Sequence, residues 1–124
     1  LAIPTYGEKA KTLMTEGLCQ MEAGQKAQAQ ASLEKSYQLD AGNPITGYNL
    51  ASLLFQNNEL TRAQFYIRRI NNTDLANEQK LWLGIKIERR MNHPTAVSQL
   101  ADQLEQRFPD SSEATAYQQG KFNE

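Results

Sequence analysis

Residues that could act as nucleophiles or metal ligands are scarce in this chain. Its 124 residues include one cysteine, Cys19, and one histidine, His93. Neither has a cysteine, histidine or carboxylate partner at the spacing of a metal site. The sequence also contains no phosphate-binding loop, nucleophile motif or supported pair of carboxylates. We therefore expect no catalytic residue, no metal and no cofactor, and we expect Cys19 to lie in the core next to Gly17.

The aromatic residues, unlike Cys19 and His93, are of types that suggest a function, which is the binding of another protein. Tyr48, Phe55 and Trp82 are of the types that anchor protein–protein contacts. The candidate partner-binding groove built around these anchors comprises Tyr48, Asn49, Ser52, Phe55, Trp82, Ile85 and Arg89. Burial in the core is the competing interpretation for each anchor. It is strongest for Phe55, because the end of a helix often buries an aromatic ring against the next hairpin.

Charge and hydropathy exclude several classes of partner. Thirteen Lys and Arg against 14 Asp and Glu give a net charge of −1, whereas a dedicated nucleic-acid or anionic-membrane binder needs a basic field. The pairs Arg68-Arg69 and Arg89-Arg90 are interpreted as solvated helix faces, because acidic or amide residues lie near them. No stretch approaches the roughly 18 apolar residues of a membrane-spanning helix.

A repeat of about 34 residues positions the candidate residues. Shifting the sequence by 34 residues, and then by a further 33, superimposes residues of the same type. This period is that of the tetratricopeptide repeat. Small residues fall where two helices must approach closely, and large apolar residues fall between neighbouring hairpins. The aligned sets are Gly17, Ala51 and Gly84; Ala29, Ala63 and Ala96; and Leu33, Ile67 and Leu100.

The predicted fold is all-α: a tetratricopeptide-repeat superhelix of three helical hairpins plus a C-terminal capping helix. The chain forms one domain, residues 1–124, with repeats at about 10–43, 44–76 and 77–109. Breakers and caps place the paired helices at about 5–23 with 26–39, 44–57 with 60–71, and 75–91 with 94–107, and the capping helix at about 111–122. Gly24, Asn57-Asn58 and Asn92-His93 mark the turns within hairpins, and Asp74 is the expected cap of the fifth helix.

The groove follows from this repeat register. In such arrays the first helix of each hairpin lines the concave surface, which gives the seven residues named above together with Ile45, Leu81 and Glu88. The first repeat adds Met14, Leu18 and Met21, for which helical spacing favours a core position. The lysine and asparagine clamp that grips a C-terminal carboxylate in some chaperone-binding members is absent, since only Asn49 matches it.

Two segments go beyond the generic repeat pattern and resemble one family. Trp82-Leu83-Gly84, within residues 81–90, and the segment Arg107 to Ser111 are similar to the C-terminal portion of the type IV pilus biogenesis and stability lipoprotein, the outer-membrane pilotin family. The segments 17–19 and 48–51 are similar to earlier repeats of that family. The turn Asn92-His93-Pro94 departs from the family's usual Gly-Asp type.

The resemblance implies a periplasm-facing protein tethered to the outer membrane by an N-terminal lipid. Members of that family help the secretin assemble into the ring through which the pilus leaves the cell. The implied partner is the secretin or another pilus assembly protein, with no nucleic acid and no membrane contact beyond the lipid. Because the chain begins with Leu1, we expect the lipidated cysteine and further repeats upstream. The secretin contacts could then lie in those repeats, and the oligomeric state stays open.

A second hypothesis comes from a different class. The chain could be a generic bacterial repeat adaptor domain of a larger regulator or enzyme, with an unknown partner. A longer gene sequence discriminates the two. An upstream signal peptide with a lipid-attachment cysteine supports the pilus hypothesis, whereas an upstream catalytic domain excludes it.

Overall fold

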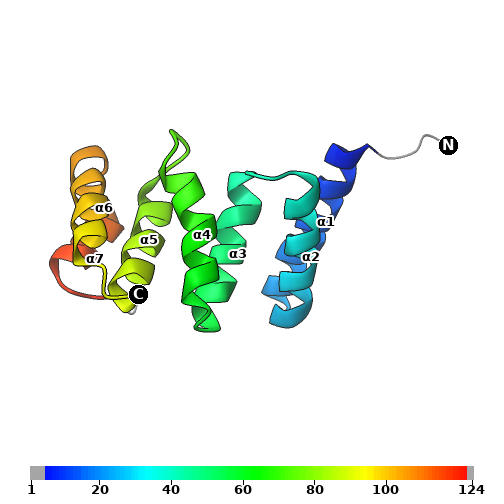
Figure 1. The fold of residues 1–124 in the computed structure, drawn as a ribbon, viewed down its shortest axis with the longest axis horizontal. Coiled ribbons are helices and arrows are strands. Elements are labelled where there is room, and N and C mark those ends of the chain that lie inside the picture. The colour runs from blue at the N-terminus through cyan, green and yellow to red at the C-terminus, as the bar shows by residue number, and fades with distance from the viewer. Residues whose placement is uncertain (1–4, 123–124) are drawn as a thin grey trace.

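The computed structural model describes residues 5–122, and every regular element in that range is an α-helix. The helices stand in a row as antiparallel neighbours (Figure 1). The all-α repeat fold predicted from the sequence is thereby confirmed. The helices are α1 (Tyr6–Glu22), α2 (Lys26–Leu39), α3 (Pro44–Gln56), α4 (Leu60–Asn71), α5 (Glu78–Arg90), α6 (Pro94–Arg107) and α7 (Ser112–Gln118).

The turns within hairpins lie where the sequence predicts them. Gly24, Asn58 and Asn92 follow α1, α3 and α5 with φ of 79°, 61° and 61°. Glycine enters this left-handed region without steric cost and asparagine tolerates it, so each residue ends its helix and reverses the chain. Pro44 and Pro94 are the first residues of α3 and α6. A proline there loses no intrahelical hydrogen bond.

The start of α5 differs from the prediction. Asp74 does not cap it; the helix begins at Glu78, and the Asn77 side chain accepts a hydrogen bond from the Lys80 amide at 2.9 Å. The reason lies in the preceding turn, where the Thr73 hydroxyl accepts the Leu75 amide at 3.1 Å. That bond holds the residues around Asp74 in a turn and delays the helix.

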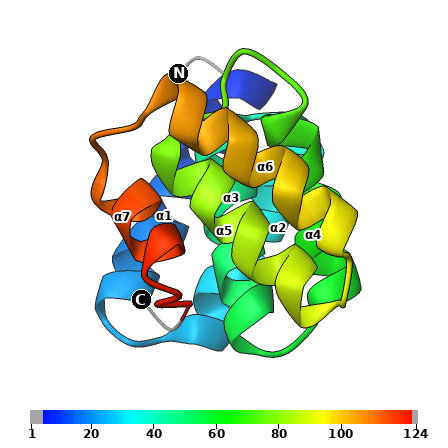
Figure 2. The ribbon, with the colours of Figure 1, turned by 90° about the vertical axis from the view of Figure 1, so that its left-hand side faces the viewer.

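The capping helix is shorter than predicted. Ser111 caps it as expected, accepting a hydrogen bond from the Ala114 amide at 3.0 Å, but α7 ends at Gln118 rather than near residue 122. Gly120 has a φ of 72°, and the Lys121 amide donates back to the Ala116 carbonyl. This glycine-terminated helix end turns the chain back toward α5 (Figures 1 and 2).

Close packing of paired helices confirms the structural role of the small residues. A Cβ on Gly17 would lie 2.7 Å from Leu33 Cγ on the paired helix α2. A Cβ on Gly84 would lie 3.2 Å from Leu100 Cδ1 on the paired helix α6 and 2.8 Å from Asn71 Nδ2 on α4. Ala29 and Ala63 are fully buried on the second helices, whereas Ala96, predicted to play the same role, is only partly buried. The three apolar clusters join α2 to α3, the pair α3 and α4 to α5, and the pair α5 and α6 to α7. Figure 2 shows α7 beside α5 and α6 at the C-terminal end of the stack.

Cys19 corrects another expectation, because its side chain is exposed rather than in the core. It lies two residues after Gly17, which places it about 200° around the helix from the face that packs on α2. Met14 and Met21, by contrast, pack against the apolar cluster of α2 and α3 as the spacing predicts. Within residues 5–122 no helix is both long and apolar enough to cross a membrane.

Ala63→Leu tests the register of the repeats. Ala63 is 0% exposed at the contact between α4 and its neighbours. Added carbons have no space, so we expect the free energy of unfolding to fall by about 1–3 kcal/mol. Chemical denaturation followed by circular dichroism measures it. Ala31→Leu, at an exposed site in α2, is the matched control, and equal stability of the two variants would contradict the register.

Candidate functional site

Aromatic and cationic side chains from α3, α5 and the segment after α7 converge on one side of the stack. Tyr48 and Phe55 are two turns apart on α3, and both pack against the apolar cluster that α3, α4 and α5 share. On α5, the Lys86 ammonium nitrogen lies 5.8 Å from the ring centre of Phe55 and 5.7 Å from that of Trp82. We call this surface the aromatic–cationic face; it comprises Tyr48, Phe55, Trp82, Lys86, Arg89 and Phe122.

Phe122 completes this face from the end of the described chain. Its ring stacks on Trp82, with centres 5.6 Å apart and planes at 23°. The Arg89 guanidinium carbon lies 4.1 Å from the centre of the Phe122 ring, within the range of a cation–π contact. Tyr117 of α7 meets the same ring edge-on. The chain's own C-terminal segment therefore covers Trp82.

The predicted groove residues divide into accessible and covered ones. Trp82 is 6% exposed and Ile85 is 0% exposed, both within the apolar cluster of α5, α6 and α7. The expectation that they line an open groove is corrected, because α7 and Phe122 pack over that part of α5. Tyr48 and Phe55 are half-buried and Arg89 is exposed, so these three side chains can reach a partner.

Asn49 and Ser52 are partly exposed on α3 but make local bonds. The Asn49 amide donates to the Ile45 carbonyl at 2.8 Å, and the Ser52 hydroxyl accepts from Gln56 at 3.5 Å. No described residue outside α3 contributes to these bonds. The binding role of all seven groove residues stays a prediction.

Two titratable groups of the aromatic–cationic face, Lys86 and Tyr48, have shifted pKa values. Burial lowers the pKa of Lys86, and the carboxylate of Glu113 on α7 partly opposes that shift. Burial also raises the pKa of Tyr48 above its ordinary value, with Glu113 adding to the rise. Glu113 thus reaches both α3 and α5. Tyr48 stays a neutral hydroxyl, while the cations of α5 supply the charge.

Sequence reasoning missed Lys86 and Phe122. Lys86 lies four residues after Trp82 and three before Arg89, so helical spacing alone places it on their stripe. Phe122 had no such signal, because its position depends on the reversal at Gly120. The interpretation of Arg89-Arg90 as a solvated face is also incomplete, since Arg90 lies over the Phe55 ring at 5.2 Å.

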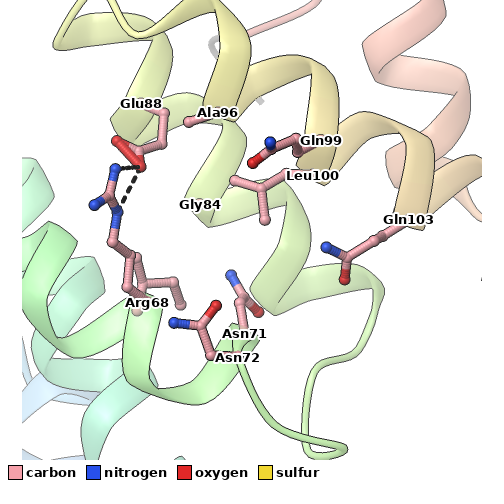
Figure 3. Close-up of a pocket in the computed structure, with 10 residues that line it drawn as sticks. Arg68, Asn71, Asn72, Gly84, Glu88, Ala96, Gln99, Leu100 and Gln103 are labelled. Atoms are coloured by element: carbon pink, nitrogen blue, oxygen red, sulfur yellow. Dashed lines mark hydrogen bonds and ion pairs between the residues drawn. The ribbon is translucent and has the colours of Figure 1, made fainter.

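Apart from the aromatic–cationic face, a hollow lies between α4, α5 and α6 (Figure 3). It measures about 270 Å³ and is lined mostly by polar residues. At one end the buried carboxylate of Glu88 accepts hydrogen bonds from Arg68 Nε at 2.9 Å and Gln64 Nε2 at 2.7 Å. Arg68 is therefore paired with Glu88, while its side chain stays 52% exposed as the predicted solvated face implies. The other lining residues are Ile67, Asn71, Asn72, Gly84, Ala96, Gln99, Leu100 and Gln103.

His93 belongs to this polar network. Its Nδ1 lies 2.9 Å from Glu88 Oε1, so the histidine joins the turn before α6 to α5. Burial raises the pKa of Glu88, but the bonds from His93, Gln64 and Arg68 outweigh it, and the net pKa is lowered. In the part of the chain that the structure describes, no cluster of His, Cys, Asp or Glu could hold a metal ion. The network joins helices instead.

Glu88→Gln tests that structural role. Glu88 is 2% exposed, and an amide nitrogen would face the donors of Arg68 and Gln64. We expect the free energy of unfolding at pH 7 to fall by about 1–3 kcal/mol. Because the folded pKa of Glu88 lies below its unfolded value, its contribution is present above about pH 4.3 and is lost as the pH falls through the folded pKa.

Denaturation of wild type and Glu88→Gln at neutral and acidic pH measures the difference. The stability gap between the two proteins should narrow as the pH falls. Glu105→Gln on the exposed side of α6 is the matched control and should leave the pH profile unchanged. A gap that is constant with pH would contradict the proposed bonds of Glu88.

Trp82→Ala tests the covered position of that ring. We expect this change to lower the free energy of unfolding by about 3 kcal/mol, because truncating a buried tryptophan leaves a cavity. Phe65→Ala, at an aromatic residue that is 54% exposed on α4, is the control and should cost less. Equal thermal stability of the Trp82 variant and wild type would show that Trp82 is not packed as described.

Known proteins share the repeat and the fold of this chain. Residues 20–82 match the family model described as tetratricopeptide repeat. The type IV pilus assembly protein PilF of Pseudomonas aeruginosa is 26% identical over 116 residues, which cover 94% of this chain and 46% of that protein. A solved structure from the functional characterization of Pseudomonas aeruginosa PilF aligns with a TM-score of 0.83 and 25% identity, over 93% of this chain and 52% of that one.

A second solved structure shares the fold. PilW, described as a widely conserved type IV pilus biogenesis factor, aligns with a TM-score of 0.75 and 24% identity, over 87% of this chain and 50% of that one. The chain thus spans about half the length of the relatives that it matches.

Proposed function

This chain belongs to the tetratricopeptide-repeat family, and we propose that it holds a protein partner during type IV pilus biogenesis. The observation that carries the proposal is the similarity to PilF, which extends over 94% of the chain. The proposed partner is the outer-membrane secretin or another pilus assembly protein. The role is assembly and stability of the pilus machinery, not catalysis.

The proposed location is the periplasmic face of the outer membrane, reached through a lipid on an upstream segment of the full-length protein. This location rests on the family resemblance of residues 81–90 and 107–111. The lipid anchor would keep the repeats near the secretin, which raises the effective concentration of the two binding surfaces.

The proposed contact surface is the accessible part of the aromatic–cationic face. Tyr48 and Phe55 present partly exposed rings on α3, and Arg89 presents an exposed guanidinium on α5. Aromatic residues and arginine are enriched among the residues that dominate binding energy. Trp82 is buried beneath this surface, where its ring stacks on that of Phe122.

The test is binding of this chain and of its full-length parent to the purified periplasmic part of the same organism's secretin. Binding by both would place a contact within these repeats. Binding by the parent alone would assign the contact to its other repeats and remove this chain from the interface. Binding by neither would contradict the secretin as partner.

Tyr48→Ala should weaken secretin binding about tenfold, since truncating an aromatic anchor typically costs 1–2 kcal/mol or more. Tyr48 is half-buried, so circular dichroism must first show unchanged helicity. Tyr6→Ala is the matched control, because Tyr6 is 72% exposed on α1 and outside the face. Isothermal titration calorimetry measures both affinities, and equal values would exclude Tyr48 from the contact.

A further inference from the structure

A small pocket opens within the aromatic–cationic face, where the ends of α3 and α5 meet the segment after α7. Its lining is Phe55, Lys86, Arg89, Arg90 and Phe122, and it measures about 190 Å³. One water molecule needs only about 10–15 Å³, so the pocket has room for a small polar group. Two aromatic rings and three cations therefore surround one accessible hollow.

The charged side chains that line this pocket are all positive. Its lining contains three cationic side chains and no carboxylate. None of the ion pairs found within residues 5–122 involves Arg89 or Arg90. Arg90 donates one bond to the neutral Asn58 side chain at 2.6 Å. Glu113 acts on Lys86 from α7 but does not line the pocket, and the positive charge on which the inference rests is that of Arg89 and Arg90.

Aromatic rings hold the cations in place without using their hydrogen-bond donors. The Arg89 guanidinium lies 4.1 Å from the Phe122 ring centre and that of Arg90 lies 5.2 Å from the Phe55 ring centre. A cation over a ring is attracted by the ring's electrons, whereas the N–H donors of a guanidinium lie at its edge. Donors thus remain for an acceptor that enters the pocket.

We propose that this pocket binds a carboxylate side chain of an acidic segment in the protein partner. The inference rests on the proposed function, because the pocket continues the face that Tyr48 and Phe55 form. A carboxylate matches the fork of donors on a guanidinium, and the rings of Phe55 and Phe122 suit apolar groups beside it. The net charge of −1 for the whole chain disfavours a nucleic acid or an anionic membrane, which require a broad basic field.

The probe for this inference is N-acetyl-aspartyl-phenylalaninamide, which carries one carboxylate next to one ring. Titration is followed by NMR on the side-chain Nε–H signals of Arg89 and Arg90. We expect these signals to shift selectively at millimolar probe, and we expect the asparaginyl analogue to bind at least about tenfold more weakly, since charge-assisted bonds are about twice as strong. Added salt should weaken binding of the aspartyl probe only.

The double variant Arg89→Gln/Arg90→Gln should lose at least about tenfold in affinity for the aspartyl probe. Arg69→Gln is the matched control, because Arg69 also lies over aromatic rings, at 5.6 Å from Phe65 and 5.7 Å from Tyr37, but outside the pocket. Circular dichroism confirms the fold of each variant. Unchanged affinity in the double variant, or equal binding of the two probes, would overturn the proposal.

Two further experiments distinguish a protein carboxylate from an anionic lipid as the ligand, and the pocket inference from the proposed function. Phosphatidylglycerol vesicles that bind through Arg89 and Arg90 in preference to the aspartyl probe would overturn the assignment to a protein carboxylate. If wild type and the double variant bind the secretin equally, the pocket inference fails while the proposed function stands. If wild type does not bind the secretin but the aspartyl probe binds through the two arginines, the secretin assignment fails and the carboxylate site stands.

Discussion

Paired helices in this protein approach each other at positions that leave no room for a side chain. A methyl group at Gly17 would overlap Leu33 of the partner helix, and one at Gly84 would overlap Asn71 of the preceding hairpin and lie 3.2 Å from Leu100 of its partner helix. The absence of a side chain at these two positions therefore sets how closely the helices approach. Because the helices are close, Leu33 and Ile67 fill the space toward the next hairpin completely. Successive hairpins then stack in register, and no single hairpin could bury these residues alone.

This stacking brings together residues that are far apart in the sequence. Repetition places α3 and α5 in equivalent positions on one side of the array, and α7 continues the series with a shorter helix (Figure 1). Lys86 consequently lies between the rings of Phe55 and Trp82, and Glu113 of α7 acts on both Lys86 and Tyr48. The candidate site is a property of the stack rather than of any one repeat.

Helix limits were predictable where a residue has only one suitable role. Pro44 and Pro94 can begin helices but not continue them, and both predicted starts are confirmed. Asp74 and Asn77 are both good caps, and the hydrogen bond that the Leu75 amide donates to the Thr73 hydroxyl decides between them. Burial of Trp82 is one of two interpretations that the sequence allows, because the outcome depends on α7 and Phe122 packing over α5. The repeat period predicts which face Trp82 occupies but not what covers it.

The two boundaries between hairpins are held by different forces. Between α4 and α5, the buried carboxylate of Glu88 receives directional bonds from Arg68 and Gln64. Between α2 and α4, the only ion pair among the described residues is that of Arg62 with Glu34, which is largely exposed and contributes little rigidity. The apolar contacts between α2 and α3 tolerate small rotations of one hairpin against the next better than the directional hydrogen bonds of Glu88 do. The array should therefore bend between its first and second hairpins. The second and third hairpins, which carry the aromatic–cationic face, should keep their relative orientation when a partner binds.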